Sequence, residues 1–178
     1  MISTPDRPPP ISDLRPVVSV LINCFNGEEY VAEAIDSVYA QTYPNWEIVF
    51  WDNASTDRTS EIVGAYDSRL RYFRSSELTP LHTARNLAIS QCEGQAVAFL
   101  DADDIWLADK LERQMELFSE RNPIIYGGYE NIDQDGNKTG FVQQNCPSGR
   151  LTSSLLLNNS ISIGSVSVSY THLTLPTT

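Results

Sequence analysis

The 178-residue chain has few cysteines and histidines, and they do not cluster. Its three cysteines, Cys24, Cys92 and Cys146, are odd in number and far apart, and only two histidines are present. This spacing provides neither a disulfide framework nor the paired ligands of a zinc site. We therefore expect a protein of a reducing compartment and assign it to the cytoplasm.

Positive charge and long apolar runs are also scarce. Twelve basic residues stand against 23 acidic residues, so the formal net charge is −11, and lysine and arginine form no cluster. A sequence-independent nucleic-acid binder needs a basic face, so we do not expect nucleic acid as a partner. No apolar stretch approaches the roughly 20 residues of a membrane span. Peripheral association with the inner face of a membrane is compatible with this composition.

The remaining composition is that of a globular protein, with 41% hydrophobic and 20% charged residues. The length suits one domain with its own core. We expect residues 1–15, which hold three consecutive prolines, to be a disordered lead-in. Residues 16–168 form the predicted domain. Residues 169–178, "SYTHLTLPTT", carry no charge and no helical period, and we predict an unstructured tail that is hypothetically foreign to the domain.

Strand-like and helix-like segments alternate along the domain. Apolar runs predict strands at 17–22, 46–51, 70–73 and 96–100. Apolar residues at helical spacing predict helices at 29–41, 57–66, 81–91 and 107–118. Farther along, we expect a strand at 124–132, a hairpin turn at 133–137, a short helix at 148–159 and a strand at 161–168. Strands that alternate with such helices indicate the α/β class, a Rossmann-like, mostly parallel sheet flanked by helices.

Polar side chains follow three of the predicted strands. They lie in Asn23 to Glu29, in Asp52 to Asp57 and in Asp101 to Asp104. The carboxyl ends of parallel strands meet at one edge of a sheet, which is where ligands bind in open α/β folds. We therefore expect these three loops to share one rim.

The stretch "FLDADDIW", residues 99–106, places three carboxylates in four positions. In an extended segment, residues two apart point to the same side, so Asp101 and Asp103 can converge on one point. Oxygen ligands without a nearby histidine or cysteine suit Mg²⁺ or Mn²⁺. Such a divalent cation would remove the repulsion between the carboxylates. The same acids alone would also fit the N-terminus of the helix that follows.

A phosphate group would need further partners. The chain contains neither G-x-G-x-x-G nor G-x-x-x-x-G-K-[ST], so a glycine-rich phosphate loop is absent. We expect the cation and Arg85, near the start of the third helix, to neutralise phosphate. Asp52 ends the second strand, where α/β nucleotide sites often place an acceptor for the base or ribose. The residues thus predict metal-assisted binding of a nucleotide diphosphate compound.

Three segments together resemble the family 2 glycosyltransferases of the GT-A fold. They are "VVSVLINCFNGEEYVAEAIDSVYAQTYPNWEIVFWDNASTDRT", "ARNLAIS" and "FLDADDIWLADKLERQ". The likeness covers roughly residues 16–135 in order and extends to Val168. It implies a transferase that moves a sugar from a nucleotide-diphosphate donor, typically a UDP-sugar, to a saccharide or lipid-linked acceptor with inversion. Cell-surface polysaccharide biosynthesis is the implied setting.

The resemblance also assigns roles to donor-binding residues. Asn23, Phe25 and Glu28 would cradle the nucleoside, and Asp52 would accept a hydrogen bond from the base. Arg85 would approach the diphosphate.

The acidic loop would complete this implied site. Asp101 and Asp103 would form the D-x-D pair, with Asp103 the main ligand of Mn²⁺ or Mg²⁺. Asp104 would border the sugar or acceptor pocket.

The general base of an inverting transfer is not found. In the family it comes from a Glu-Asp segment well after the D-x-D loop. Here "NNSISIGSVSVS" resembles the text before that segment, but no acidic residue follows Asp135. The domain is therefore interpreted as incomplete at its C-terminus.

Two other functions remain as alternatives. Phosphoryl transfer or hydrolysis would need an aspartate nucleophile after the first strand, where Asn23 stands instead. A non-catalytic fragment that binds a nucleotide sugar would need no general base.

Overall fold

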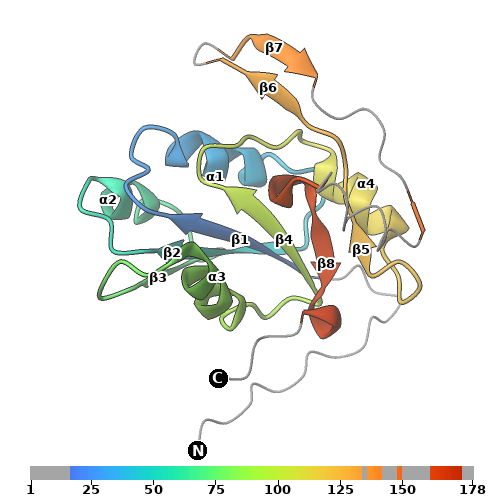
Figure 1. Cartoon of the computed structure of the whole chain (residues 1–178), viewed down its shortest axis with the longest axis horizontal. Coiled ribbons are helices and arrows are strands. Elements are labelled where there is room, and N and C mark those ends of the chain that lie inside the picture. The colour runs from blue at the N-terminus through green and yellow to red at the C-terminus, as the bar shows by residue number, and fades with distance from the viewer. Residues whose placement is uncertain (1–16, 134–135, 142–147, 150–160, 174–178) are drawn as a thin grey trace, which may run out of the picture.

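The computed structural model of the chain describes residues 17–133, 136–141, 148–149 and 161–173 (Figure 1). The predicted lead-in at 1–15 lies outside the described residues, as does nearly all of the helix expected at 148–159. No helix in the described part of the chain is both long and apolar enough to cross a bilayer.

The centre of the molecule is a six-stranded sheet in the order β3-β2-β1-β4-β8-β5. Its strands are β1 (Val18–Cys24), β2 (Trp46–Asp52), β3 (Leu70–Arg74), β4 (Ala96–Asp101), β5 (Ile124–Ile125) and β8 (Ser167–Ser169). The first four are parallel, and β8 runs antiparallel between β4 and β5. The predicted α/β class with a mostly parallel sheet is therefore confirmed.

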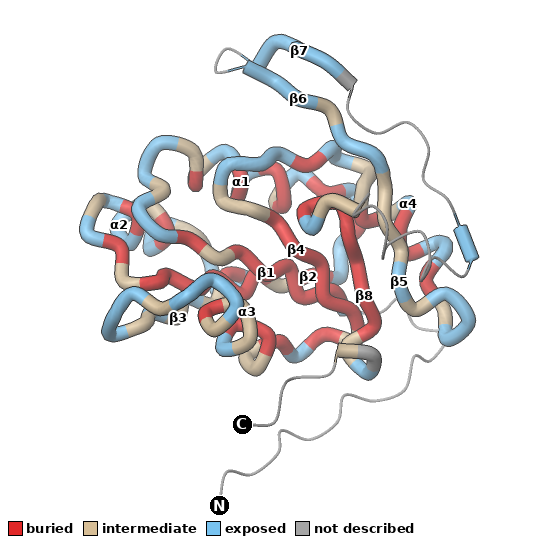
Figure 2. Tube along the Cα trace, viewed as in Figure 1, coloured by how far each residue is buried: buried red, intermediate tan, exposed pale blue. Residues whose placement is uncertain are grey.

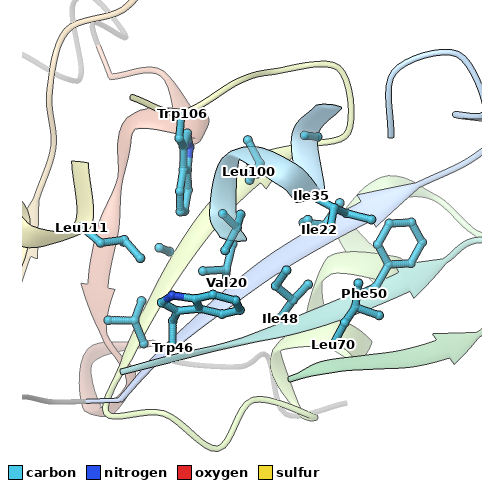
Figure 3. Packing of buried hydrophobic residues seen from close by; sticks show 14 of the residues in the cluster. Val20, Ile22, Ile35, Trp46, Ile48, Phe50, Leu70, Leu100, Trp106 and Leu111 are labelled. Atoms are coloured by element: carbon cyan, nitrogen blue, oxygen red, sulfur yellow. The ribbon is translucent and has the colours of Figure 1, made fainter. Parts of the chain in front are cut away.

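Helices cover both faces of this sheet. They are α1 (Val31–Tyr39), α2 (Thr59–Val63), α3 (Leu81–Ile89) and α4 (Lys110–Leu117), and all four are shorter than the ranges predicted from the sequence. Successive strand residues point to opposite faces. The even-numbered residues of β1 pack with α1 and α4 in one core cluster, whereas Leu21 packs with α3 in a second. Figure 2 shows most of each central strand buried, and Figure 3 shows the first cluster, which includes Ile22, Ile35 and Leu111.

The segment after α4 differs from the sequence prediction. The strand expected at 124–132 is divided into β5, in the main sheet, and β6 (Glu130–Ile132), which pairs with β7 (Lys138–Phe141) in a separate hairpin. A 3₁₀ helix at Ile163–Ser165 replaces the first part of the strand expected at 161–168. The chain therefore returns to the sheet only at β8.

The start of the predicted tail is also structured. Ser169 is the last residue of β8, and its N–H donates to the Pro123 carbonyl over 2.7 Å. Tyr170 begins a 3₁₀ turn, and Tyr170 and Leu173 pack against the second core cluster. The expectation of an unstructured segment from residue 169 is thus corrected for residues 169–173. Residues 174–178 lie outside the described residues, and a foreign origin of the tail stays a hypothesis.

Candidate functional site

The sheet has a topological switch point at β1. The chain proceeds from β1 to β2 and β3 on one side, whereas β4 pairs with β1 on the other side. In register, Asn23 of β1 lies between Trp51 of β2 and Asp101 of β4. Ligands of open α/β sheets bind outside the carboxyl ends of strands at such a point. The predicted meeting of the three polar loops at one edge is confirmed.

The acidic loop leaves this edge directly from β4. The N–H of Asp104 donates to the Asp101 carbonyl over 3.1 Å, which closes a tight turn around Asp103. Burial raises the pKa of the Asp101 carboxyl, Arg85 lowers it in part, and the charge of Asp103 raises it again. Burial and the charges of Asp101 and Asp103 raise the pKa of Asp104. The loop therefore concentrates negative charge that a cation would stabilise.

A contact with the C-terminal segment holds the acidic loop in place. The indole Nε1–H of Trp106 donates to the Gly164 carbonyl over 3.1 Å, and the Trp106 N–H donates to Ser37 Oγ over 3.1 Å. A Cβ at Gly164 would lie 2.7 Å from Asp104 Oδ2. The glycine thus leaves room for the Asp104 carboxylate.

Arg85 reaches the same edge from α3. Its Nη2 lies 3.4 Å from Asp101 Oδ1, and its guanidinium carbon lies 5.9 Å from the centre of the Phe99 ring. The structure therefore brings Arg85 together with the acidic loop, as expected for a group that would neutralise phosphate beside a metal.

Several polar atoms at this edge have no protein partner. Among the described residues, four buried side-chain atoms lack a hydrogen bond: both polar atoms of Asn23, Nε1 of Trp51 and Nε of Arg85. An unsatisfied buried polar group costs about 1–3 kcal/mol. Native proteins keep few such groups, and each calls for an explanation such as a missing ligand or water.

Asp52 is placed as predicted and already accepts three hydrogen bonds from protein groups. Its side chain is 0% exposed. Its Oδ1 accepts from the Ser55 N–H over 2.7 Å, and its Oδ2 accepts from the Tyr72 hydroxyl and from Arg74 Nη1, the latter over 3.1 Å. These protein donors tie the carboxylate into the fold, and the contact between Asp52 and a base stays a prediction. Asp52 ties β2 to β3 and to the loop that follows β2.

The loop after β1 contains the other two predicted nucleoside contacts. Phe25 is 47% exposed and therefore available for contact with a ligand. Glu28 has a structural partner, because its Oε2 accepts from the Arg58 N–H over 2.9 Å while its own N–H donates to Asp57 over 2.9 Å. This pairing joins the loop to the start of α2.

Two residues at this edge were not singled out from the sequence. The Asn53 carboxamide donates to the Thr79 carbonyl over 2.8 Å and accepts from its N–H over 3.1 Å. Trp51 of β2 is the register neighbour of Asn23. Its position one residue before Asp52, at the end of an apolar strand, was the available signal.

The donor set fits a divalent cation only in part. The described residues include no group of three or more His, Cys, Asp or Glu side chains that could hold a metal. A cation bound by one or two carboxylates completes its coordination with water and substrate phosphate. Asp101 and Asp103 are the two carboxylates that would hold such a cation here, although a turn at residues 102–103 replaces the extended segment expected from the sequence.

Comparison with known proteins points in the same direction. The family model described as "Glycosyl transferase family 2" matches residues 19–170. The putative teichuronic acid biosynthesis glycosyltransferase TuaG of Bacillus subtilis is 37% identical over 130 residues, which cover 71% of this chain and 52% of TuaG. UDP-Glc:alpha-D-GlcNAc-diphosphoundecaprenol beta-1,3-glucosyltransferase WfgD of Escherichia coli is 36% identical over 128 residues, which cover 71% of this chain and 51% of WfgD. The chain thus spans about half the length of these relatives.

Solved structures share the fold. TarS 1–349 of S. aureus superposes with a TM-score of 0.69 at 23% identity, over 86% of this chain and 47% of that chain. Its complex with UDP-GlcNAc gives 0.57 at 30% identity, over 61% of this chain and 33% of that one. The mannosyltransferase PcManGT of Pyrobaculum calidifontis, in complex with GDP-Man and Mn²⁺, gives 0.58 at 28% identity, over 66% and 36%. The chain therefore belongs to glycosyl transferase family 2 and has the GT-A fold of nucleotide-diphospho-sugar transferases.

Proposed function

We propose that this chain carries the donor-binding half of a glycosyltransferase that uses a UDP-sugar. The observation that carries the proposal is the meeting of Arg85 with the acidic loop at the switch point, beside the unpartnered carboxamide of Asn23. A cationic side chain next to a carboxylate pair suits a pyrophosphate that is bridged to a divalent cation. The neighbouring structures with UDP-GlcNAc and with GDP-Man and Mn²⁺ support this proposal.

Each residue has a distinct task in the proposed site. Asn23 and Phe25 contact the nucleoside, and Arg85 contacts the pyrophosphate. Asp101 and Asp103 hold Mn²⁺ or Mg²⁺, with Asp103 the main ligand because Asp101 also faces Arg85.

Two predicted residues have supporting tasks. Asp104 borders the side of the site next to Gly164, where the sugar or acceptor would lie. Glu28 shapes the loop after β1 through its bond to Arg58.

The proposed reaction is an inverting displacement at the sugar carbon. When bound, the cation stabilises the charge that develops on the leaving nucleoside diphosphate. Arg85 adds a positively charged donor at the same position. The acceptor hydroxyl would also need a base to take its proton. Because none of residues 136–178 is acidic, we assign no general base to this chain.

The names of two relatives support a proposal for the acceptor and the setting. WfgD is named for a diphosphoundecaprenol-linked acceptor, and TuaG for teichuronic acid biosynthesis. We propose a saccharide or lipid-linked acceptor, a role in cell-surface polysaccharide biosynthesis, and a cytoplasmic location at the inner face of the membrane.

A second candidate is a fragment that binds the nucleotide sugar without turning it over. Such a fragment would need no general base, and none is assigned within residues 136–178. Phosphoryl transfer is not retained, because Asn23 occupies the position that would need a carboxylate nucleophile.

Calorimetric titration with UDP tests donor binding. We expect Mn²⁺-dependent heat that chelation with EDTA and Asp103→Asn both abolish. Asp109→Asn is the matched control, because Asp109 pairs with Arg113 on the surface over 2.6 Å, and it should bind like the wild type. Equal binding in EDTA would refute the metal site. Release of UDP from UDP-GlcNAc then separates an enzyme from a binding fragment.

A further inference from the structure

The indole of Trp51 combines deep burial with an unused hydrogen-bond donor. The residue is 9% exposed, and its Nε1–H has no partner. An indole nitrogen can only donate. Trp106 provides the contrast, because it is 7% exposed and its Nε1–H is satisfied by the Gly164 carbonyl. The unpaired N–H is therefore particular to the place that Trp51 occupies.

That place is the proposed donor site. Trp51 is the register neighbour of Asn23, and Asn23 is the register neighbour of Asp101. Trp51 and Phe99 belong to the core cluster on the α3 side of the sheet, and Arg85 of α3 reaches Asp101 across the Phe99 ring. The unpartnered atoms thus come from one row of side chains on one face of the sheet.

The chemistry of these atoms selects the kind of group that they can bind. Three of the four are N–H donors, from Asn23, Trp51 and Arg85, and the fourth is the carbonyl oxygen of Asn23. A complementary group must offer acceptor oxygens and at least one O–H or N–H. A pyrophosphate offers no donor when ionised, whereas a ribose, a sugar and a uracil-type base all offer both.

We propose that Trp51 is a donor-contacting residue, whose indole N–H and the adjacent Asn23 carboxamide bind a neutral polar group of the nucleotide sugar. The proposal rests on the proposed function and extends it to a residue with no polar task in the fold. The ring stacks on Phe73 with 6.5 Å between centroids, so the indole is held rigidly and its donor is preorganised.

The indole resonances of the ¹⁵N-labelled wild-type chain test the proposal directly. The chain has three tryptophans, and Trp51→Phe identifies the relevant signal. We expect the Trp51 indole proton to move downfield when the wild-type chain is saturated with UDP-GlcNAc and Mn²⁺, while the Trp106 signal stays in place. A shift with uridine alone assigns the contact to the nucleoside, and a shift only with UDP-GlcNAc assigns it to the sugar. A shift with UDP that is absent with uridine would contradict a neutral group.

Affinity provides the second readout. Trp51→Phe keeps an aromatic ring but removes the N–H donor together with part of the indole, and we expect about tenfold weaker binding of the responsible ligand. Trp46→Phe is the control, because Trp46 packs in the other core cluster against Tyr39, and it should bind normally. If the wild type binds UDP-GlcNAc but the Trp51 signal does not move and Trp51→Phe binds equally well, this inference fails alone. If the wild type binds none of the ligands, the proposed function fails with it.

Discussion

Replacement of Asp52 by alanine tests whether this carboxylate is structural. The residue ends β2, where a ligand contact was expected, but three protein donors surround its side chain. If these bonds are its task, Asp52→Ala lowers stability and leaves ligand binding largely intact. If a ligand base is its partner, the order of effects reverses.

The size of the loss follows from which donors can reach water. Ser55 is 2% exposed, so its N–H is left buried and unpaired at a cost of about 1–3 kcal/mol. Tyr72 is 37% exposed and the Arg74 side chain 44%, so both can be rehydrated at smaller cost. We expect Asp52→Ala to lower the free energy of unfolding by about 3 kcal/mol.

Urea unfolding followed by circular dichroism measures this loss. Asp67→Ala is the control, since Asp67 forms an exposed ion pair with Arg69, and it should cost less than about 1 kcal/mol. The folded Asp52→Ala variant should bind UDP within about threefold of the wild type. Unchanged stability together with at least about tenfold weaker UDP binding would refute the structural role.

Three further predictions concern the acidic loop and its surroundings. The pKa of Asp104 is raised in the folded chain, so its charged form destabilises the fold. In scanning calorimetry with EDTA, Asp104→Asn should therefore melt at a higher temperature than the wild type at neutral pH. This difference should shrink toward about pH 4, because the wild-type carboxyl becomes protonated there. Burial lowers the pKa of Lys110 to about 7, so the unfolded chain binds more protons above that pH. The urea midpoint should therefore rise from about pH 7 to pH 8.5 more steeply in the wild type than in Lys110→Met. Gly164→Ala places a Cβ 2.7 Å from Asp104 Oδ2 and should displace that carboxylate. Titration calorimetry should then show weaker Mn²⁺-dependent binding of UDP. An unchanged affinity would show that UDP binding does not need this glycine.

The parallel half of the fold could be predicted because its signals are local. β1 and β4 are near-continuous apolar runs, as expected for strands covered on both faces. β8 could not be placed in this way, because it inserts between β4 and β5 through pairings with residues more than 40 positions away. The apolar residues at 124–132 likewise do not reveal that β6 leaves the sheet to pair with β7.

The sequence was enough to predict which loops form the candidate site, but not which hydrogen bonds their side chains make. Parallel topology alone brings Asp101 to the edge beside Asn23. Two of the hydrogen bonds that Asp52 accepts come from Tyr72 and Arg74, alternate residues of β3 whose register with β2 exists only in the folded sheet. The unpaired donor of Trp51 is equally invisible in the sequence, because its apolar neighbours describe an ordinary strand.

Paramagnetic broadening by Mn²⁺ tests the central claim most directly, namely that the carboxylates after β4 hold a cation together with a nucleoside diphosphate. With UDP present, substoichiometric Mn²⁺ should broaden the amide signals of residues 101–104 before any others, and Asp103→Asn should remove the effect. Broadening that is centred elsewhere on the chain, or that persists unchanged in Asp103→Asn, would contradict the account.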